Sequence, residues 1–201
     1  FHKNAVRIPI AKAVKSGLEV RHGKTEHDIS CFYRIFSRSR KRHGLPPIPY
    51  IYFKSLWDVF GTSGNLTVLS AVYKEKPVAA SLLLKFKDSV TVEFGCDLIE
   101  YRKLCPNHFL DWKAIQLACD EGFKLFSFGR TSPNNKGLMT YKERWGTRVE
   151  DLSQYFYPES FGDTGEEKES SWKYRLIRSI CRKAPDPLFR IIGKFIYRHM
   201  G

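Results

Sequence analysis

The chain has 201 residues, of which 42% are hydrophobic and 14% aromatic, so it can bury the core of one folded domain. This composition excludes an intrinsically disordered chain, and no apolar run is long enough to cross a bilayer. The net charge of +13 favours polyanionic partners: RNA, phosphorylated substrates or an anionic membrane face. A basic surface that serves solubility alone is the alternative.

The N-terminal segment has the pattern of a helix that leads into a strand. Apolar residues recur among basic ones over Ala5–Lys15, which predicts an amphipathic helix whose start Pro9 can delay. Gly17 suits the end of this helix, and Leu18–Val20 can begin a strand. The first fifty residues carry eleven Lys and Arg against three acids, so the basic excess is greatest here.

A second helix is predicted between Thr25 and Gly44. Thr25 and Asp28 have the spacing of a capping pair, and Gly44 suits a C-terminal stop. The basic run Arg38–Arg42 falls in the last turns, where cations complement the helix dipole. Contact of this run with nucleic acid is the alternative interpretation.

The hydrophobic period changes after a proline-rich connector. A short helix is predicted near Phe53–Phe60. Three β-rich runs with two short turns between them come next, at Leu66–Tyr73, Val78–Phe86 and Val90–Cys96. Consecutive strands joined by short turns predict an antiparallel meander.

The following segment alternates helices with short strands. Asn107 is predicted to cap a helix with an apolar face, and Gly122 to end it. A strand, a helix and a final strand are predicted at Lys124–Phe128, Leu138–Trp145 and Val149–Tyr157. This order of elements predicts an α/β (α+β) fold, in which helices flank a mixed, largely antiparallel sheet.

The sequence divides into three parts. We predict a core domain over residues 1–158, a polar linker over 159–171, and basic amphipathic helices over 172–201. The last part carries eight Lys and Arg and one acid, Asp186. Such helices suit the surface of an anionic membrane. Packing on the core domain, or on a further domain, is the alternative.

Several classes of site find no support. The five cysteines are dispersed without a CxxC pair, so we expect a reduced, cytoplasmic compartment and cysteines that act mostly as small buried apolar groups. No HExxH motif or paired Cys/His spacing predicts a metal site. Nucleotide-phosphate loops and the GxSxG nucleophile motif are also missing from the sequence.

Two segments carry candidate binding residues. Before the predicted helix at Asn107, a basic loop holds Arg102, and together they suit a phosphate, because helix N-termini bind anions. In the second segment Arg130 follows a predicted strand, where it can pair with a substrate phosphate or carboxylate, or anchor the next loop. Thr131 and Ser132 either line the same pocket or form the turn.

The order of elements resembles the Gcn5-related N-acetyltransferase (GNAT) fold. The stretches LCPNHFLDWKAIQLACDEGFKLFSFGRTSP and GLMTYKERWG are similar to the Fem-type (FemAB) branch of that superfamily. Two positions depart from its patterns. Ser127 stands where the Fem-type pattern has an aspartate, and the GNAT pyrophosphate pattern is missing before Asn107.

The resemblance implies transfer of an acyl or aminoacyl group to an amine or hydroxyl in bacterial cell-envelope or exopolysaccharide synthesis. The implied donor substrate is acyl-CoA or aminoacyl-tRNA, the acceptor is a cell-envelope or glycan precursor, and no cofactor is tightly bound. Fem-type proteins usually have two GNAT domains, so we expect this chain to be the second of them, cytoplasmic and peripheral on the inner face of the membrane. The rival hypothesis is a non-catalytic basic module that binds RNA or an anionic membrane.

The same resemblance places the aromatic–lysine pair of the family on Tyr141 and Lys142. A cation at Lys142 can stabilise the oxyanion of a tetrahedral intermediate or hold the phosphates of the donor. A solvated lysine on a helix surface is the alternative. Trp145 is predicted to pack in the core, and no residue stands out as a general base.

Overall fold

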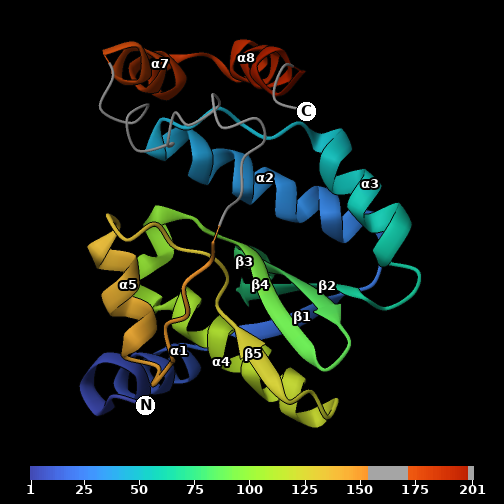
Figure 1. The fold of residues 1–201 in the computed structure, drawn as a ribbon, viewed down its shortest axis with the longest axis vertical. Coiled ribbons are helices and arrows are strands. Elements are labelled where there is room, and N and C mark those ends of the chain that lie inside the picture. The colour runs from blue at the N-terminus through green and yellow to red at the C-terminus, as the bar shows by residue number, and fades with distance from the viewer. Residues whose placement is uncertain (154–171, 199–201) are drawn as a thin grey trace. The chain divides into compact units, whose positions relative to one another are not determined.

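The computed structural model describes residues 1–153 and 172–198 (Figure 1). In chain order the elements are η1 (Lys3–Arg7), α1 (Ile8–Lys15), β1 (Glu19–Gly23), α2 (Glu26–His43), α3 (Tyr50–Phe60), β2 (Leu66–Tyr73), β3 (Lys76–Phe86), β4 (Ser89–Asp97), η2 (Ile99–Leu104), α4 (Pro106–Asp120), β5 (Leu125–Ser127), α5 (Lys136–Glu143), α7 (Trp172–Lys183) and α8 (Asp186–Arg198). They form two compact units. The first comprises Phe1–Ser39 and Tyr50–Val149, and the second Arg40–Pro49 and Glu150–Gly201.

The first unit is built on a five-stranded sheet with the strand order β1-β2-β3-β4-β5 (Figure 1). Strands β1 to β4 pair antiparallel, and β5 pairs parallel with β4. Lys74 and Glu75 join β2 to β3 and both have positive φ, as a two-residue turn of type I′ requires. The predicted meander and the mixed, largely antiparallel sheet are confirmed.

Strands β4 and β5 share only a short stretch of pairing. Ser89–Thr91 pairs with Leu125–Ser127, and no described strand pairs with the rest of β4 on this side. On the other side the register shifts, because Leu83 lies opposite Val92 and Leu82 opposite Phe94. Glu93 is therefore the extra residue of a β-bulge, which bends the strand. The two strands separate at the end where the candidate site lies.

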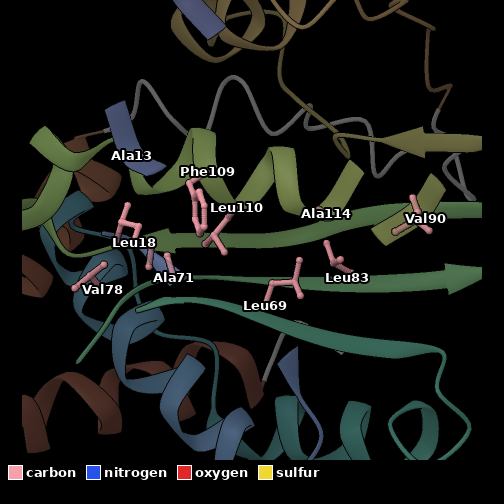
Figure 2. Packing of buried hydrophobic residues seen from close by; sticks show 12 residues of the cluster. Ala13, Leu18, Leu69, Ala71, Val78, Leu83, Val90, Phe109, Leu110 and Ala114 are labelled. Atoms are coloured by element: carbon pink, nitrogen blue, oxygen red, sulfur yellow. The ribbon is translucent and has the colours of Figure 1, made fainter. Parts of the chain in front are cut away.

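One face of the sheet is covered by α1 and α4. Their apolar side chains interlock with those of the strands, as Figure 2 shows for Ala13, Leu18, Leu69, Ala71, Val78, Leu83, Val90, Phe109, Leu110 and Ala114. All of these side chains are buried, and each fully buried Leu or Phe contributes about 1.5–3 kcal/mol. This packing fixes α4 on the sheet, and with it the polar residues that α4 brings to the site.

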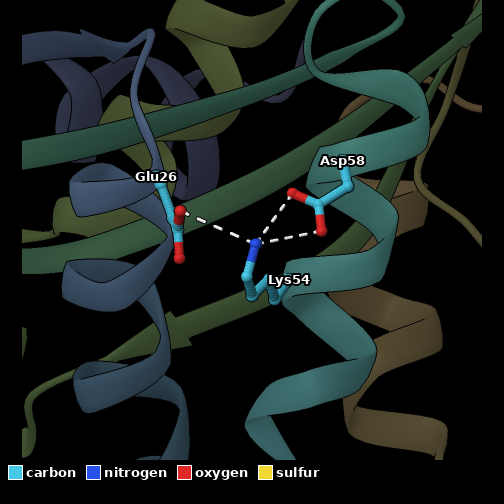
Figure 3. A network of polar contacts seen from close by, with 3 residues as sticks. All are labelled: Glu26, Lys54 and Asp58. Carbon is cyan, nitrogen blue, oxygen red and sulfur yellow. Dashed lines mark hydrogen bonds and ion pairs between the residues drawn. The ribbon is translucent and has the colours of Figure 1, made fainter.

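The other face of the sheet is covered by α2 and α3. The rings of Phe36 and Phe53 contact Phe94 of β4, with centroids 5.5 and 5.2 Å apart. On the exposed side, Lys54 of α3 donates to both carboxylate oxygens of Asp58 at 3.0 Å and lies 3.7 Å from Glu26 of α2 (Figure 3). Exposed ion pairs of this kind stabilise a fold little, so the aromatic contacts carry the packing.

Two predicted helix starts differ from the observed ones. Helix α4 begins at Pro106 and its N-cap is Cys105, with φ of 57°, so the prediction that Asn107 caps it is wrong. Proline fits the first helical position because it lacks the N–H that would have no partner there, and the helix therefore starts earlier. Helix α5 begins at Lys136, because Asn135 caps it by accepting from the Leu138 N–H at 3.2 Å.

The prediction of a final strand at Val149–Tyr157 is wrong over residues 149–153, which form no strand. Val149 and Leu152 are 56% and 68% exposed, so these residues bury no apolar face against the sheet. Residues 154–157, the predicted boundary at 158 and the linker at 159–171 lie outside the described residues. The predicted burial of the cysteines holds for Cys96 and Cys181 but is wrong for the other three, of which Cys119 is exposed.

The second unit contains α7 and α8, in the segment where two basic helices are predicted. Cys181, Ala184 and Phe189 form a small core between them. The Arg40 guanidinium donates to the Tyr197 hydroxyl at 3.0 Å, and Lys41 pairs with Asp186 at 2.6 Å. A proline-rich connector and two helices thus build a core separate from that of the first unit.

Candidate active site

The candidate site lies where the chain leaves β5 beside β4. Gly129 has a φ of +69°, and a Cβ at this position would lie 2.7 Å from the carbonyl oxygen of Val92. Only glycine combines this left-handed conformation with so close an approach to a neighbouring backbone. The following turn and the Asn135 cap then direct α5 back toward the end of β5.

Lys142, in the last turn of α5, is held at that point. Its ammonium Nζ donates to the carbonyl oxygen of Gly129 at 2.7 Å, and its side chain is half-buried. Burial lowers the pKa of Lys142, and the negative charge of Asp111 acts in the opposite direction. The Thr147 hydroxyl donates to the carbonyl oxygen of Lys142 at 3.1 Å, which holds the end of the helix in place.

Beside Lys142, the Tyr141 hydroxyl donates to Oδ2 of Asp111 at 2.5 Å. Asp111 lies on α4 and is 9% exposed. Burial raises the pKa of Asp111 to about 6, against the opposing effects of the Tyr141 hydrogen bond and the Lys142 charge. Burial and the Asp111 charge also raise the pKa of Tyr141 above its ordinary value, so its phenol stays a neutral hydrogen-bond donor at neutral pH.

An aromatic wall encloses this pair. The His108 ring lies 5.0 Å from that of Tyr141 and 6.3 Å from that of Trp145, and Phe1 packs edge-on against Trp145 at 5.3 Å. Burial, with the nearby charge of Arg144, lowers the pKa of His108, so the imidazole is neutral at neutral pH. Trp145 is 3% exposed, which confirms its predicted packing role.

The three residues predicted after β5 have different surroundings. Arg130 is exposed and makes no hydrogen bond or ion pair with the described residues, so the loop-anchoring alternative gains no support. The Thr131 hydroxyl is buried without a partner among the described residues. Ser132 accepts from the N–H of Asn134 at 3.3 Å and, through its carbonyl, from that of Asn135 at 2.9 Å, so it forms the turn.

Arg102 lies in η2, just before α4, and Asn107 lies in the first turn of α4. The Arg102 guanidinium makes two hydrogen bonds to Asp97, at 2.5 and 3.2 Å, while 49% of its side chain stays exposed. Asp97 is 4% exposed, so Arg102 compensates a buried charge. Asn107 is exposed in the first turn of the helix. Within the described residues neither makes a hydrogen bond to Tyr141 or Lys142.

Sequence reasoning missed Asp111 and His108. A signal for Asp111 was present in the sequence, because this acid directly follows Phe109 and Leu110 on the apolar face of a predicted helix. An acidic side chain that is buried on such a face nearly always has a partner and is often functional. No group of three or more metal-ligating side chains occurs in residues 1–153 and 172–198. Over the same residues, no helix is long and apolar enough to cross a membrane.

Comparisons with known proteins agree with this architecture. The family described as acetyltransferase (GNAT) domain matches residues 2–143. The chain is 28% identical over 101 residues to a lipid II:glycine glycyltransferase of Staphylococcus saprophyticus, a match that covers 46% of the chain and 24% of that protein. The chain thus spans about a quarter of the length of the curated relatives it matches.

Among solved structures, FemX superposes with a TM-score of 0.66 at 14% identity, over 73% of this chain and 54% of that one. An aminoglycoside N-acetyltransferase, AAC(6')-Iy in complex with CoA, superposes with a TM-score of 0.55 at 12% identity, over 70% of this chain and 95% of that one. These likenesses concern the fold. The family match includes Asp111, Gly129, Tyr141 and Lys142, and the likeness to the glycyltransferase supports the Fem-type branch. The chain belongs to the acetyltransferase (GNAT) domain family.

Proposed function

We propose that the chain transfers an acyl or aminoacyl group to an amine or hydroxyl of a cell-envelope or exopolysaccharide precursor, with Lys142 at the reaction centre. The observation that carries this proposal is the fixed position of Lys142. Its ammonium is bound to the Gly129 carbonyl at 2.7 Å where β5 separates from β4, in a domain of a transferase family.

The donor binds along β4 in this proposal. Residues 94–97 of β4 pair with β3 on one side and with no described strand on the other, so their backbone groups on that side are available to an extended ligand. An extended donor that carries amide groups can add to this edge in the manner of a further strand. The CoA complex of AAC(6')-Iy supports acyl-CoA as the donor. The glycyltransferase relative supports an aminoacyl donor as the second option. We propose tRNA as the carrier of that group, as the Fem-type resemblance implies.

In the chemical step the acceptor amine or hydroxyl attacks the donor carbonyl carbon. A bond from nitrogen or oxygen to that carbon forms, and the bond from the carbon to the donor sulfur or oxygen breaks. The leaving group takes up the proton that the acceptor loses, directly or through water. The carbonyl oxygen carries negative charge in between, and the ammonium of Lys142 stabilises it without reorganisation, because it is already held in place.

Tyr141 and Asp111 support Lys142 in two ways. The hydrogen bond between them joins α5 to α4 and so fixes the helix that carries Lys142. The negative charge of Asp111 raises the pKa of Lys142 against the effect of burial, which favours the charged ammonium. Tyr141 acts as a neutral donor here, since its raised pKa prevents ionisation at neutral pH.

We assign the remaining polar residues to substrate binding. Arg130 presents an exposed guanidinium beyond β5, which suits a phosphate or carboxylate of the acceptor, with Thr131 and Ser132 beside it in the chain. Arg102 in η2 and Asn107 in the first turn of α4 lie on either side of the N-terminus of α4 in the chain, where a donor phosphate meets backbone N–H groups. A preceding domain in the whole protein, on the cytoplasmic side of the membrane, completes this arrangement in our proposal.

The test is product formation. The chain, and the full-length protein that contains it, are incubated with isotope-labelled acyl-CoA or glycyl-tRNA and a lipid-linked cell-wall precursor, and products are identified by mass spectrometry. Label transferred to the precursor supports the proposal. Salt-sensitive binding of RNA without any product, from either protein, supports a non-catalytic basic module instead.

A further inference from the structure

Helices α7 and α8 lie beyond residue 143, where the family match ends. Each helix has an apolar row that remains exposed in addition to the row that it buries. On α7 Cys181 is buried, and so is Ala184, which directly follows the helix. Trp172, Leu176 and Ile180 recur every four residues on another side of the helix and are 68%, 51% and 45% exposed.

The second helix repeats this arrangement. Phe189 is buried, and Gly193 meets the carbonyl oxygen of Pro47 so closely that a side chain has no room there. The exposed row consists of Leu188, Ile191 and Phe195, which are 47%, 61% and 68% exposed. Their spacing of three and four residues places them along one stripe of the helix. The buried residues build the core of the second unit, whereas the side chains of the outer rows keep 45–68% of their surface exposed.

Basic residues lie on both helices. On α8 the spacing puts Arg190, Lys194 and Arg198 on one side, next to the exposed row. On α7, Arg175 borders the exposed row, while Arg178 donates to the carbonyl oxygen of His43 at 3.3 Å. Asp186 is the one acid from residue 172 to 198, and it is paired with Lys41 at 2.6 Å. A cavity of about 330 Å³ on α7 is lined, among the described residues, by Ser179 and four cations: Arg175, Arg178, Arg182 and Lys183.

We infer that the outer face of α7 and α8 docks on the anionic phospholipid surface of a membrane. The exposed apolar rows enter the boundary between headgroups and acyl chains, and the basic residues bind headgroup phosphates. Neither helix is long and apolar enough to cross the bilayer, so both lie in its surface. This docking would bring the enzyme to a lipid-linked acceptor, although the inference itself does not depend on the transfer reaction.

Charge decides among the possible occupants of this face. A second copy of the chain would bring eight more basic residues and one acid to the interface, and like charges repel. RNA would satisfy the basic residues but leave six large apolar side chains in water. An anionic lipid surface matches both kinds of side chain at once, because it offers phosphates and apolar volume side by side.

The test is co-sedimentation of the full chain with vesicles of phosphatidylcholine alone, and with about 30% phosphatidylserine or phosphatidylglycerol added. We expect binding to the anionic vesicles only, weakened when salt rises from about 0.05 to 0.5 M. Trp172 emission should shift to the blue on binding, because its exposed indole enters an apolar phase. A Trp172→Phe variant should bind and lose most of that shift.

Two matched sets of substitutions separate this face from general basicity. Leu188→Ser/Ile191→Ser/Phe195→Ser should weaken vesicle binding about tenfold or more. The control set Ile51→Ser/Val59→Ser/Phe86→Ser, whose side chains are 65%, 63% and 71% exposed in the first unit, should bind as the parent does. Circular dichroism and thermal unfolding verify that each variant is folded.

The charged set works in the same way. Arg190→Glu/Lys194→Glu/Arg198→Glu should abolish binding to anionic vesicles, since each cation near such a surface contributes about fivefold. Lys12→Glu/Lys15→Glu/Lys124→Glu, with the same change of net charge in the first unit, should keep most of the binding. Equal binding by the α8 variants and their controls overturns the inference. So does a parent chain that ignores anionic vesicles, or one that forms a dimer which the apolar α8 variant converts to a monomer.

Discussion

The Tyr141 hydroxyl donates a 2.5 Å hydrogen bond to the buried carboxylate of Asp111, thirty residues earlier in the chain. This bond joins the helix that carries Lys142 to the helix that packs on the sheet. It also holds a negative charge inside the domain, close enough to affect the pKa of Lys142. The stability of the fold and the charge of the candidate catalytic lysine therefore depend on the same carboxylate.

The first prediction concerns Asp111 and stability. Because its folded pKa of about 6 lies above the ordinary value of 3.8, the folded state holds its proton more tightly than the unfolded state between these values. The contribution of Asp111 to the free energy of unfolding is therefore largest in acid and declines as pH rises through this window, by roughly 3 kcal/mol. In Asp111→Asn the amide oxygen can still accept the Tyr141 hydrogen bond, but the side chain does not titrate. The decline in unfolding free energy with pH should therefore disappear.

Urea unfolding of parent and Asp111→Asn from about pH 4 to pH 8 measures the difference. We expect the free energy of unfolding of Asp111→Asn to increase relative to that of the parent as pH rises. Asp120→Asn, at an exposed acid on the same helix, is the control and should leave the pH dependence unchanged. Parallel pH curves for the parent and Asp111→Asn would exclude a raised pKa at Asp111.

The second prediction links Asp111 to the pH dependence of the reaction. The Asp111 charge raises the pKa of Lys142, so its removal should lower that pKa further. If Lys142 acts as an ammonium, activity falls as it loses its proton at high pH. In Asp111→Asn the alkaline limb of the pH–rate profile should move to lower pH. Asp120→Asn is the reference and should keep the alkaline limb of the parent. If the limb of Asp111→Asn also stays at the pH of the parent, Lys142 is not the group whose deprotonation lowers the rate.

The third prediction concerns Gly129. Gly129→Ala combines positive φ with a Cβ placed 2.7 Å from the Val92 carbonyl, so we expect a loss of about 2–4 kcal/mol of unfolding free energy. Gly122→Ala is the matched control, because Gly122 has a φ of +79° but no atom within 4 Å of the added Cβ. It should cost about 1 kcal/mol. Thermal or urea unfolding measures both losses. If Gly129→Ala and Gly122→Ala lose equal amounts of unfolding free energy, the close approach of Gly129 to β4 does not contribute to the cost of the substitution.

Much of the fold could be predicted because its signals are local. Two short turns between β-rich runs predicted the meander, and the capping pair Thr25 and Asp28 is observed, with Asp28 accepting from the backbone N–H of Thr25 at 3.0 Å. The Asn107 cap failed because two signals competed within two residues. Pro106 fits the first helical position, and the residue before it takes the cap position despite its positive φ.

The site was predicted less completely, because its contacts span distant segments. Tyr141 and Lys142 were found by their likeness to a family pattern. Their partners Asp111 and Gly129 lie 30 and 13 residues away and meet them only once α4 and β5 are on the sheet. The β-bulge at Glu93 and the end of the β4–β5 pairing at Thr91 and Ser127 have no signal of their own in the sequence.

The central claim is that the ammonium of Lys142 stabilises the transition state of acyl transfer. Once the transfer assay has identified a donor and an acceptor, kcat of Lys142→Ala is compared with that of the parent and of Lys136→Ala, a control at an exposed lysine of the same helix. We expect Lys142→Ala to lose about 10²–10³-fold in kcat with little change in thermal stability, and Lys136→Ala to match the parent. An unchanged kcat in folded Lys142→Ala would contradict the account.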